Sequence, residues 1–121
     1  MNYNLKGTGM QISDAARSHV EKQLMHLDKF FGERSGARLD VELHYMRDEE
    51  KTYRAEGTLR DHGFEGDFRV EATGHELNEA IDIMVNTLSL ELSRAKKKYI
   101  DHKRKGAARF KDFIRGFRDR F

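Results

Sequence analysis

Residues 77–105 read LNEAIDIMVNTLSLELSRAKKKYIDHKRK, and the pattern of this stretch decides the fold. Apolar residues recur at steps of three and four, the period of one face of an α-helix. They are Leu77, Ile81, Met84, Leu88, Leu92, Ala95 and Tyr99. No Gly or Pro interrupts the pattern before Gly106, so we predict one helix of about 45 Å that ends at this glycine.

The second half of this predicted helix is strongly cationic. Residues 93–121 contain 12 Lys and Arg against 3 Asp and Glu, a net charge of +9, whereas residues 1–92 contain 11 against 18, a net charge of −7. A cationic segment on an acidic body favours a phosphate-bearing partner, although a solvated segment that only keeps the protein soluble is the alternative. The predicted RNA contacts here are Arg94, Lys96, Lys97, Lys98, Lys103, Arg104 and Lys105.

The sequence before this helix predicts a strand, a helix and three strands. Alternation over residues 2–9 is typical of a short strand. Helical spacing then predicts a helix that Ser13 caps and Gly32 ends. Apolar residues alternate again over residues 38–46, 51–60 and 64–72. The short connections between these three strands predict antiparallel hairpins, and the first helix can cross between two parallel strands.

Two glycines interrupt the apolar face of the predicted sheet. Gly57 and Gly66 have no side chain there, which predicts that a helix approaches the sheet closely at both positions. Two apolar helix stripes and one apolar sheet face predict an α+β fold, a two-layer sandwich of order βαβββα with four strands and both helices on one face. We expect this domain to span residues 1–105, with a basic-aromatic tail over 106–121.

The opposite sheet face is predicted to be mostly acidic. Its charged residues in the sequence pattern are Asp40, Glu42, His44, Arg54, Glu56, Glu65, Asp67, Arg69 and Glu71. Sheets that bind single-stranded RNA present aromatic and cationic side chains instead. We therefore expect nucleic acid to contact the helices or the tail.

The tail is cationic and aromatic at once. Four of the eight Phe fall in it at helical spacing, and an isolated helix of this length is marginal in water. We expect it to dock as a short helix, either on this protein's own helix near Ile83 and Leu90 or on a partner. The predicted tail contacts are Arg109, Lys111, Phe113, Arg115, Phe117 and Arg118.

The residues of an enzyme or a metal site are missing from the sequence pattern. The chain has no Cys, and its six His form no i, i+4 metal-binding pair; His62 is expected to be an exposed turn residue. No glycine-rich phosphate loop and no protected acid–base pair stand out. We therefore predict no catalysis, no metal, no cofactor and no small-molecule substrate.

No secretory signal and no apolar run of about 18 residues occur, so a cytoplasmic protein without a membrane span is expected.

Several short motifs, in order, resemble one protein family. They are a Gly-containing first strand, RSHVEK at 17–22, LDKFF at 27–31, YRAE at 53–56 with Leu59, the run 72–77 followed by AID at 80–82, and RAKKK at 94–98. Together they resemble the ribosome hibernation-promoting factors, a family that includes protein Y and the sigma-54 modulation proteins. The resemblance covers about residues 1–105 and implies the βαβββα fold.

The resemblance also implies a function. A member of this family would bind the small ribosomal subunit and its rRNA, block the mRNA and tRNA sites and keep ribosomes inactive. By position it implies contacts from Arg17, Lys22 and Lys29 on the first helix and from Arg94, Lys96 and Lys98 on the last helix. It also suggests a ribosomal protein as a partner for the tail. The chain resembles a short member without the additional C-terminal domain of long members, and its last helix has Thr87, Leu90 and Glu91 where relatives are basic or polar. An interaction protein whose basic amphipathic tail docks on a protein or an anionic membrane surface remains the alternative.

Overall fold

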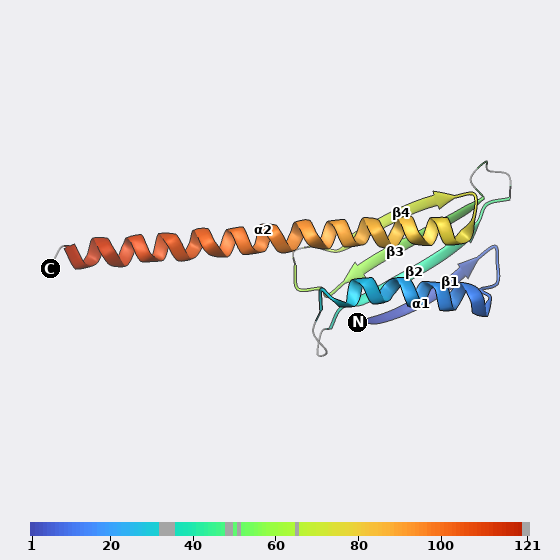
Figure 1. Ribbon diagram of the computed structural model, residues 1–121, viewed down its shortest axis with the longest axis horizontal. Helices are drawn as coiled ribbons and strands as arrows, with labels where there is room; N and C mark the ends of the chain where they lie inside the picture. The colour runs from blue at the N-terminus through green and yellow to red at the C-terminus, as the bar shows by residue number, and fades with distance from the viewer. Residues whose placement is uncertain (32–35, 48–49, 51, 65, 120–121) are drawn as a thin grey trace.

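The structure is a computed structural model of the 121-residue chain. It describes residues 1–31, 36–47, 50, 52–64 and 66–119, with side chains as far as Lys103. The elements in chain order are β1 (Asn2–Thr8), α1 (Asp14–Asp28), β2 (Arg38–Tyr45), β3 (Tyr53–Arg60), β4 (Phe68–Gly74) and α2 (Leu77–Asp119). Figure 1 shows this βαβββα order, which confirms the predicted α+β fold.

The four strands form one sheet in the order β1-β2-β3-β4. β1 and β2 are parallel and joined by α1, whereas β2, β3 and β4 are antiparallel neighbours. A parallel pair needs a crossover, and α1 supplies it. Ser13 caps this helix as predicted, because its Oγ accepts a hydrogen bond of 3.1 Å from the Ala16 N–H. α1 ends at Asp28, and Gly32 lies outside the described residues.

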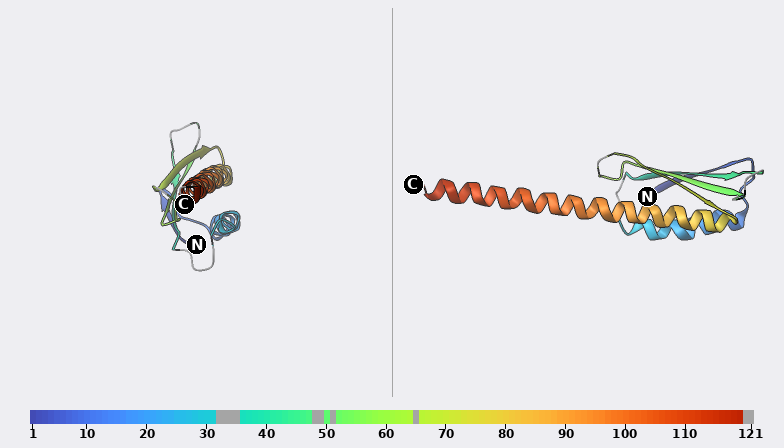
Figure 2. Two further views of the ribbon diagram at one scale, coloured as in Figure 1. Left: turned by 90° about the vertical axis from the view of Figure 1, so that its left-hand side faces the viewer. Right: turned by 90° about the horizontal axis from the view of Figure 1, so that it is seen from above.

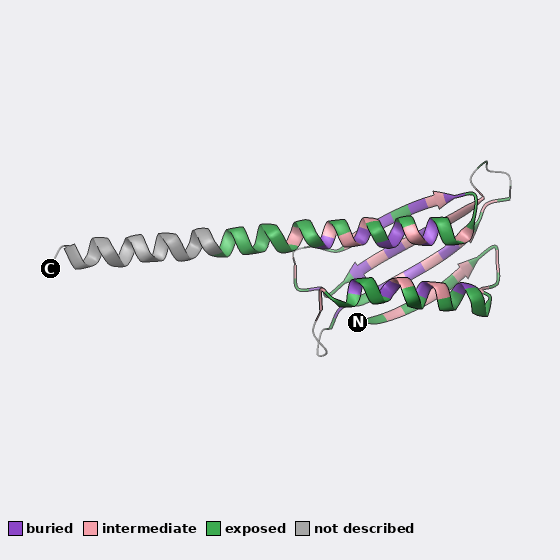
Figure 3. Cartoon of the chain, viewed as in Figure 1, coloured by how far each residue is buried: buried purple, intermediate pink, exposed green. Residues whose placement is uncertain are grey.

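Both helices cover the same face of the sheet, as the end-on view in Figure 2 shows. Apolar residues alternate with polar ones along the strands, so one face supplies side chains to the core and the other faces solvent. Figure 3 shows the buried positions of the helices on the side that faces the sheet. The largest fully buried side chains include Leu27 of α1, Leu39 and Leu43 of β2, and Met84 and Leu88 of α2.

Gly57 of β3 brings α2 close to the sheet, as predicted. A Cβ at this position would lie 3.1 Å from Met84 Sδ and 3.2 Å from Leu88 Cδ1. The prediction for Gly66 is wrong, because β4 begins only at Phe68 and Gly66 lies in the preceding turn with φ +75° and open space around it.

We expect Gly57→Val to destabilise the protein by about 1–3 kcal/mol, because its methyl groups must displace Met84 and Leu88 in a packed core. Urea denaturation should show a lower midpoint with an unchanged slope. Gly36→Val is the control, since a Cβ there meets no atom within 4 Å. Equal midpoints for the two variants would contradict close packing of α2 on β3.

α2 is longer than the sequence pattern predicts. It does not end at Gly106 but runs unbroken for 43 residues to Asp119, about 65 Å. Glycine inside a helix costs only about 1 kcal/mol relative to alanine, and helix-forming residues flank Gly106 on both sides. Figure 1 shows the second half of α2 projecting away from the sheet, so the predicted docking of the tail on Ile83 and Leu90 does not occur.

Among the described helices, none combines the length and the apolar character needed to cross a membrane.

The connection between β3 and β4 also differs from the prediction. Phe64 does not lie in a strand but in the turn after β3, where Asp61, Gly63 and Gly66 have positive φ. His62, predicted to be exposed, is 7% exposed and stacks on Phe68 at 4.3 Å between ring centroids. The turn therefore has a small aromatic core of its own.

Candidate nucleic-acid interface

The cations predicted on the last helix are exposed where α2 leaves the sheet. The buried stripe ends at Leu92; Tyr99, which the spacing places on the same stripe, is 48% exposed because no strand lies beneath it. Arg94, Lys96, Lys97, Lys98 and Lys103 are all exposed. Among residues 93–103 the structure describes a single ion pair, between Arg94 and Glu91 at 3.8 Å. This segment therefore presents nearly unneutralised positive charge to solvent.

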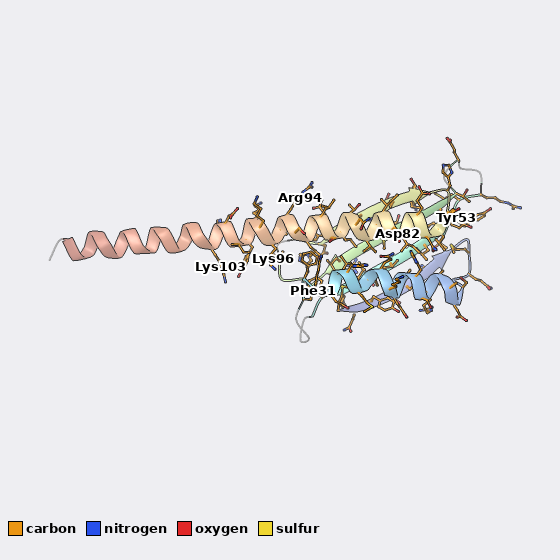
Figure 4. All side chains as sticks on the ribbon, in the orientation of Figure 1. Phe31, Tyr53, Asp82, Arg94, Lys96 and Lys103 are labelled. Carbon is orange, nitrogen blue, oxygen red and sulfur yellow. The ribbon has the colours of Figure 1, made fainter. Side chains whose placement is uncertain are left out.

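These cations lie on two sides of α2. Figure 4 shows Arg94 and Lys96 projecting to opposite sides of the helix. On one side, Lys96 and Ile100 line a hollow together with Lys29 and Phe30 from the end of α1, which we call the helix groove. Lys29 Nζ lies 5.3 Å from the centroid of the Phe30 ring. The fold thus brings Lys29, predicted from the first helix, beside the cations of α2.

A second hollow, which we call the turn groove, lies on the other side of α2. Its volume is about 660 Å³, and it is lined by Phe64 of the β3–β4 connection, by Phe68 at the start of β4, and by Arg94, Lys98 and Tyr99 of α2. The rings of Phe64 and Tyr99 meet edge to face at 6.1 Å between centroids. Sequence reasoning missed this groove, because Phe64 and Tyr99 are far apart in the chain and both were assigned to the core.

The other two cations predicted on the first helix lie apart from these grooves. Arg17 is exposed on the side of α1 above β1, next to Tyr3, whose hydroxyl donates a hydrogen bond to Glu21. That hydrogen bond raises the pKa of Tyr3, and the positive charge of Arg17 opposes the rise. Lys22 is exposed on the outer surface of α1. The two grooves therefore bring together Lys29 and the α2 cations, and Arg17 and Lys22 lie apart from them; all of these contacts stay predictions.

The two helices are held in register by a polar contact. His19 Nε2 of α1 lies 2.7 Å from Asp82 Oδ1 of α2. Figure 4 shows Asp82 between the two helices. This contact lies in the second turn of both helices, and it joins them at the end opposite the helix groove.

The solvent-facing side of the sheet is an ion-pair network. Arg54 pairs with Glu56 at 3.2 Å, and Arg60 pairs with Asp40 at 2.7 Å. Thr8 donates a hydrogen bond to Glu42, and this bond holds the pKa of Glu42 below its usual value. Arginines therefore partly neutralise the predicted acidic surface. One of them, Arg60, is not among the residues that the sequence pattern predicts on this face. Glu65 lies outside the described residues.

One cluster in this network has the residue types of a metal site. Nitrogen and oxygen atoms of Glu42, His44 and Glu56 lie within 4.8 Å of one another, and the buried His44 Nε2 has no hydrogen-bond partner. Glu56, however, also pairs with Arg54 and lies 4.0 Å from Arg69. These guanidinium groups already supply positive charge at that point, which opposes the binding of a cation.

The remaining predicted contacts cannot be placed as side chains. Arg104, Lys105 and the tail residues Arg109, Lys111, Phe113, Arg115, Phe117 and Arg118 lie beyond the side chains that the structure describes. Their backbone belongs to α2. They stay predictions.

The chain matches the family described as "Sigma 54 modulation protein / S30EA ribosomal protein" over residues 3–100, and it therefore belongs to this family. The resemblance drawn from the sequence motifs is confirmed. The match ends near the point where α2 leaves the folded body, so most of the projecting helix lies outside it.

Relatives within this group carry names that refer to ribosomes. The ribosome hibernation promotion factor of Bacillus subtilis is 26% identical over 98 residues, which cover 81% of this chain and 50% of the relative. The ribosome hibernation promoting factor of Escherichia coli K12 is 26% identical over 102 residues, which cover 84% of this chain and 100% of the relative. The chain thus spans about half the length of the Bacillus relative and the whole length of the Escherichia one.

Solved structures show the same fold. The crystal structure of the N-terminal domain of Thermus thermophilus protein Y superposes with a TM-score of 0.64 and 32% sequence identity, covering 78% of this chain and 98% of that domain. A ribosomal subunit interface protein from Coxiella burnetii superposes with the same TM-score at 19% identity, covering 80% of this chain and 99% of that one.

Proposed function

We propose that this protein is a ribosome hibernation factor that binds the rRNA of the small ribosomal subunit at the mRNA and tRNA sites. It keeps ribosomes inactive in the cytoplasm by occupying those sites. It acts by binding and catalyses no reaction.

The observation that carries the proposal is the gathering of exposed cations where α2 leaves the sheet, in a chain of this family. Lys29, Lys96 and Lys97 border one groove, and Arg94 and Lys98 border the other. Because these charges are exposed and almost unpaired, they are available to neutralise phosphates and to release counterions on binding. The names of the Bacillus and Escherichia relatives support the ribosome as the source of those phosphates.

The shape of the molecule supports the mode of inhibition. The folded body is a two-layer sandwich. Exposed cations gather at the end of its helical side, where α2 leaves the sheet, whereas the sheet side carries paired charges. RNA helices are recognised mainly by shape and by backbone contacts, so a body that presents cations on one side is suited to fill a channel lined with rRNA. The body then excludes mRNA and tRNA by its volume.

The test is co-sedimentation of the full chain with purified small subunits over a range of KCl concentrations. If about six phosphates are neutralised, the logarithm of the association constant should fall against the logarithm of salt with a slope of about −5, using the coefficient for duplex DNA. Subunits loaded with mRNA and initiator tRNA should bind less protein. A slope near zero, or unchanged binding to loaded subunits, would contradict the proposal; binding to anionic vesicles but not to subunits would favour the alternative of a membrane-docking tail.

A further inference from the structure

We propose that the turn groove binds an unpaired nucleotide of the RNA, with its base against Phe64 and Tyr99 and its flanking phosphates on Arg94 and Lys98. This inference deepens the proposed function and rests on it, because it names the kind of nucleotide that the cationic side of α2 receives. It adds base stacking to a surface that would otherwise recognise only phosphate.

The groove combines the two features that single-stranded RNA requires. Phe64 is half-buried and Tyr99 is 48% exposed, so part of each ring remains open to a ligand. Arg94 and Lys98 stand one helical turn apart on the rim, about 6 Å along the axis. Among the described residues that line the groove, Glu91 is the one carboxylate; it lies 3.8 Å from Arg94, and no ion pair of Lys98 is described. Proteins that bind single-stranded nucleic acid stack the bases on aromatic side chains and hold the phosphates with cations beside them.

The turn that carries Phe64 is held in place from within. The Phe64 N–H donates a hydrogen bond of 3.1 Å to His62 Nδ1, and His62 Nε2 lies 2.6 Å from the Gly66 carbonyl oxygen. Because Nδ1 accepts the hydrogen bond from Phe64, Nε2 is the ring nitrogen that donates to the Gly66 carbonyl oxygen. The His62 ring also stacks on Phe68 at 4.3 Å. Phe64 therefore faces α2 in a fixed position before any ligand arrives, which lowers the entropy lost on binding.

Tyr99 has a cation at one face of its ring. Lys103 Nζ lies 4.8 Å from the centroid of the Tyr99 ring, which shows a cation at an aromatic face of α2. A nucleotide entering the groove brings a π-face for the aromatic rings and a negative charge for Lys98 and Lys103. An acidic protein segment would satisfy only the cations, which is why we favour RNA.

The experiment compares short single-stranded RNA with an abasic oligomer of the same length, which carries the same phosphates without bases. We expect the full chain to bind the RNA at least about fivefold more tightly than the abasic oligomer, measured by fluorescence anisotropy. Phe64→Leu and Tyr99→Leu retain apolar volume and remove the stacking ring, so each should abolish that preference. Tyr99 lies beyond the core, so Tyr99→Leu should remain folded even where Phe64→Leu does not.

The matched control is Phe30→Leu, which removes the ring of the helix groove on the other side of α2. This variant should keep the preference for RNA over the abasic oligomer. Equal affinity of the wild-type chain for the two oligomers, or an unchanged preference in folded Tyr99→Leu, would overturn the inference. Tighter binding of poly-glutamate than of the single-stranded RNA under the same conditions would assign the groove to an acidic protein and overturn the inference as well.

Binding to small subunits, measured in parallel, separates this inference from the proposed function. If wild type and Tyr99→Leu bind subunits with equal affinity, the proposed function stands and the nucleotide site is wrong. If the wild-type chain binds single-stranded RNA with a preference for bases but does not bind subunits, the site stands and the choice of the small subunit is wrong.

Discussion

Replacing Arg94, Lys97 and Lys98 together by Gln is expected to weaken binding to small ribosomal subunits by about 500-fold at about 0.1 M salt. Each neutralised phosphate releases about 0.9 of a counterion, and the variant loses three such contacts. At about 0.1 M salt this loss lowers the decimal logarithm of the association constant by about 2.7. The slope against the logarithm of salt should become shallower by about the same amount, 2.7. The three residues border one continuous exposed surface of α2.

The matched control changes the same net charge on the other side of the molecule. Arg38, Arg60 and Arg69 lie at or near the solvent-facing side of the sheet, in ion pairs with Asp61, Asp40 and Glu71. Replacing these three by Gln should leave the salt slope unchanged. If both triple variants lost affinity equally, only the net charge of the protein would matter, and the helical side would not be the binding surface.

The α2 variant should also remain folded. Its three positions are exposed and lie after Leu92, the last buried residue among the described side chains of α2. Surface substitutions of this kind change the free energy of unfolding by about 0.5 kcal/mol or less. A thermal melt that coincides with that of the wild-type chain would therefore assign the loss of affinity to the missing charges.

The second large effect is expected for stability: Leu88→Ala should lower the free energy of unfolding by about 2–5 kcal/mol. Leu88 is fully buried, and one of its methyl groups fills the space above Gly57 of β3. Truncation removes the burial of the side chain and leaves a cavity that the rigid strand beneath cannot fill. Because a domain of this size is stable by only about 5–15 kcal/mol, the loss is a large part of the total.

Leu90→Ala is the control for this prediction. Leu90 lies two residues further along α2 but is 57% exposed, so its truncation should change stability by about 0.5 kcal/mol or less. Chemical denaturation of the two variants under identical conditions measures the difference. A change below about 0.5 kcal/mol for Leu88→Ala would mean that the stripe of α2 does not face the sheet.

The sequence by itself determined the elements and the faces they bury. The period of α2 from Leu77 to Leu92, the alternation in β2 and the N-cap at Ser13 are local patterns, and local patterns set which side of a helix or strand is apolar. The order of the elements then left α1 as the crossover between two parallel strands. Family membership also followed from short motifs in sequence order.

Sequence patterns could not predict where the sheet ends beneath α2 or where β4 begins. Tyr99 continues the spacing of the stripe but lies past the end of the sheet, and the position of that end depends on the length of the strands and on the turn before β4. For the same reason Phe64 was assigned to a strand, although the positive φ at Gly63 and Gly66 turns the chain there. The sequence predicts a helix end at Gly106, but α2 continues through it. Glycine is common just after a helix and is also tolerated inside one, so the residue alone does not distinguish the two positions.

Only the tertiary structure decided which cations lie side by side. Arg17 and Lys22 lie on α1 and Lys29 is its C-cap. α1 directs Arg17 over β1 and Lys22 to solvent, and of these three cations only Lys29 lies beside Lys96 and Lys97. The period of a helix gives the angle of each side chain about its own axis. Which residues surround that side chain depends on how the helix packs on the sheet. In this protein the packing follows from the crossover between β1 and β2, the close approach of α2 at Gly57 and the contact of His19 with Asp82.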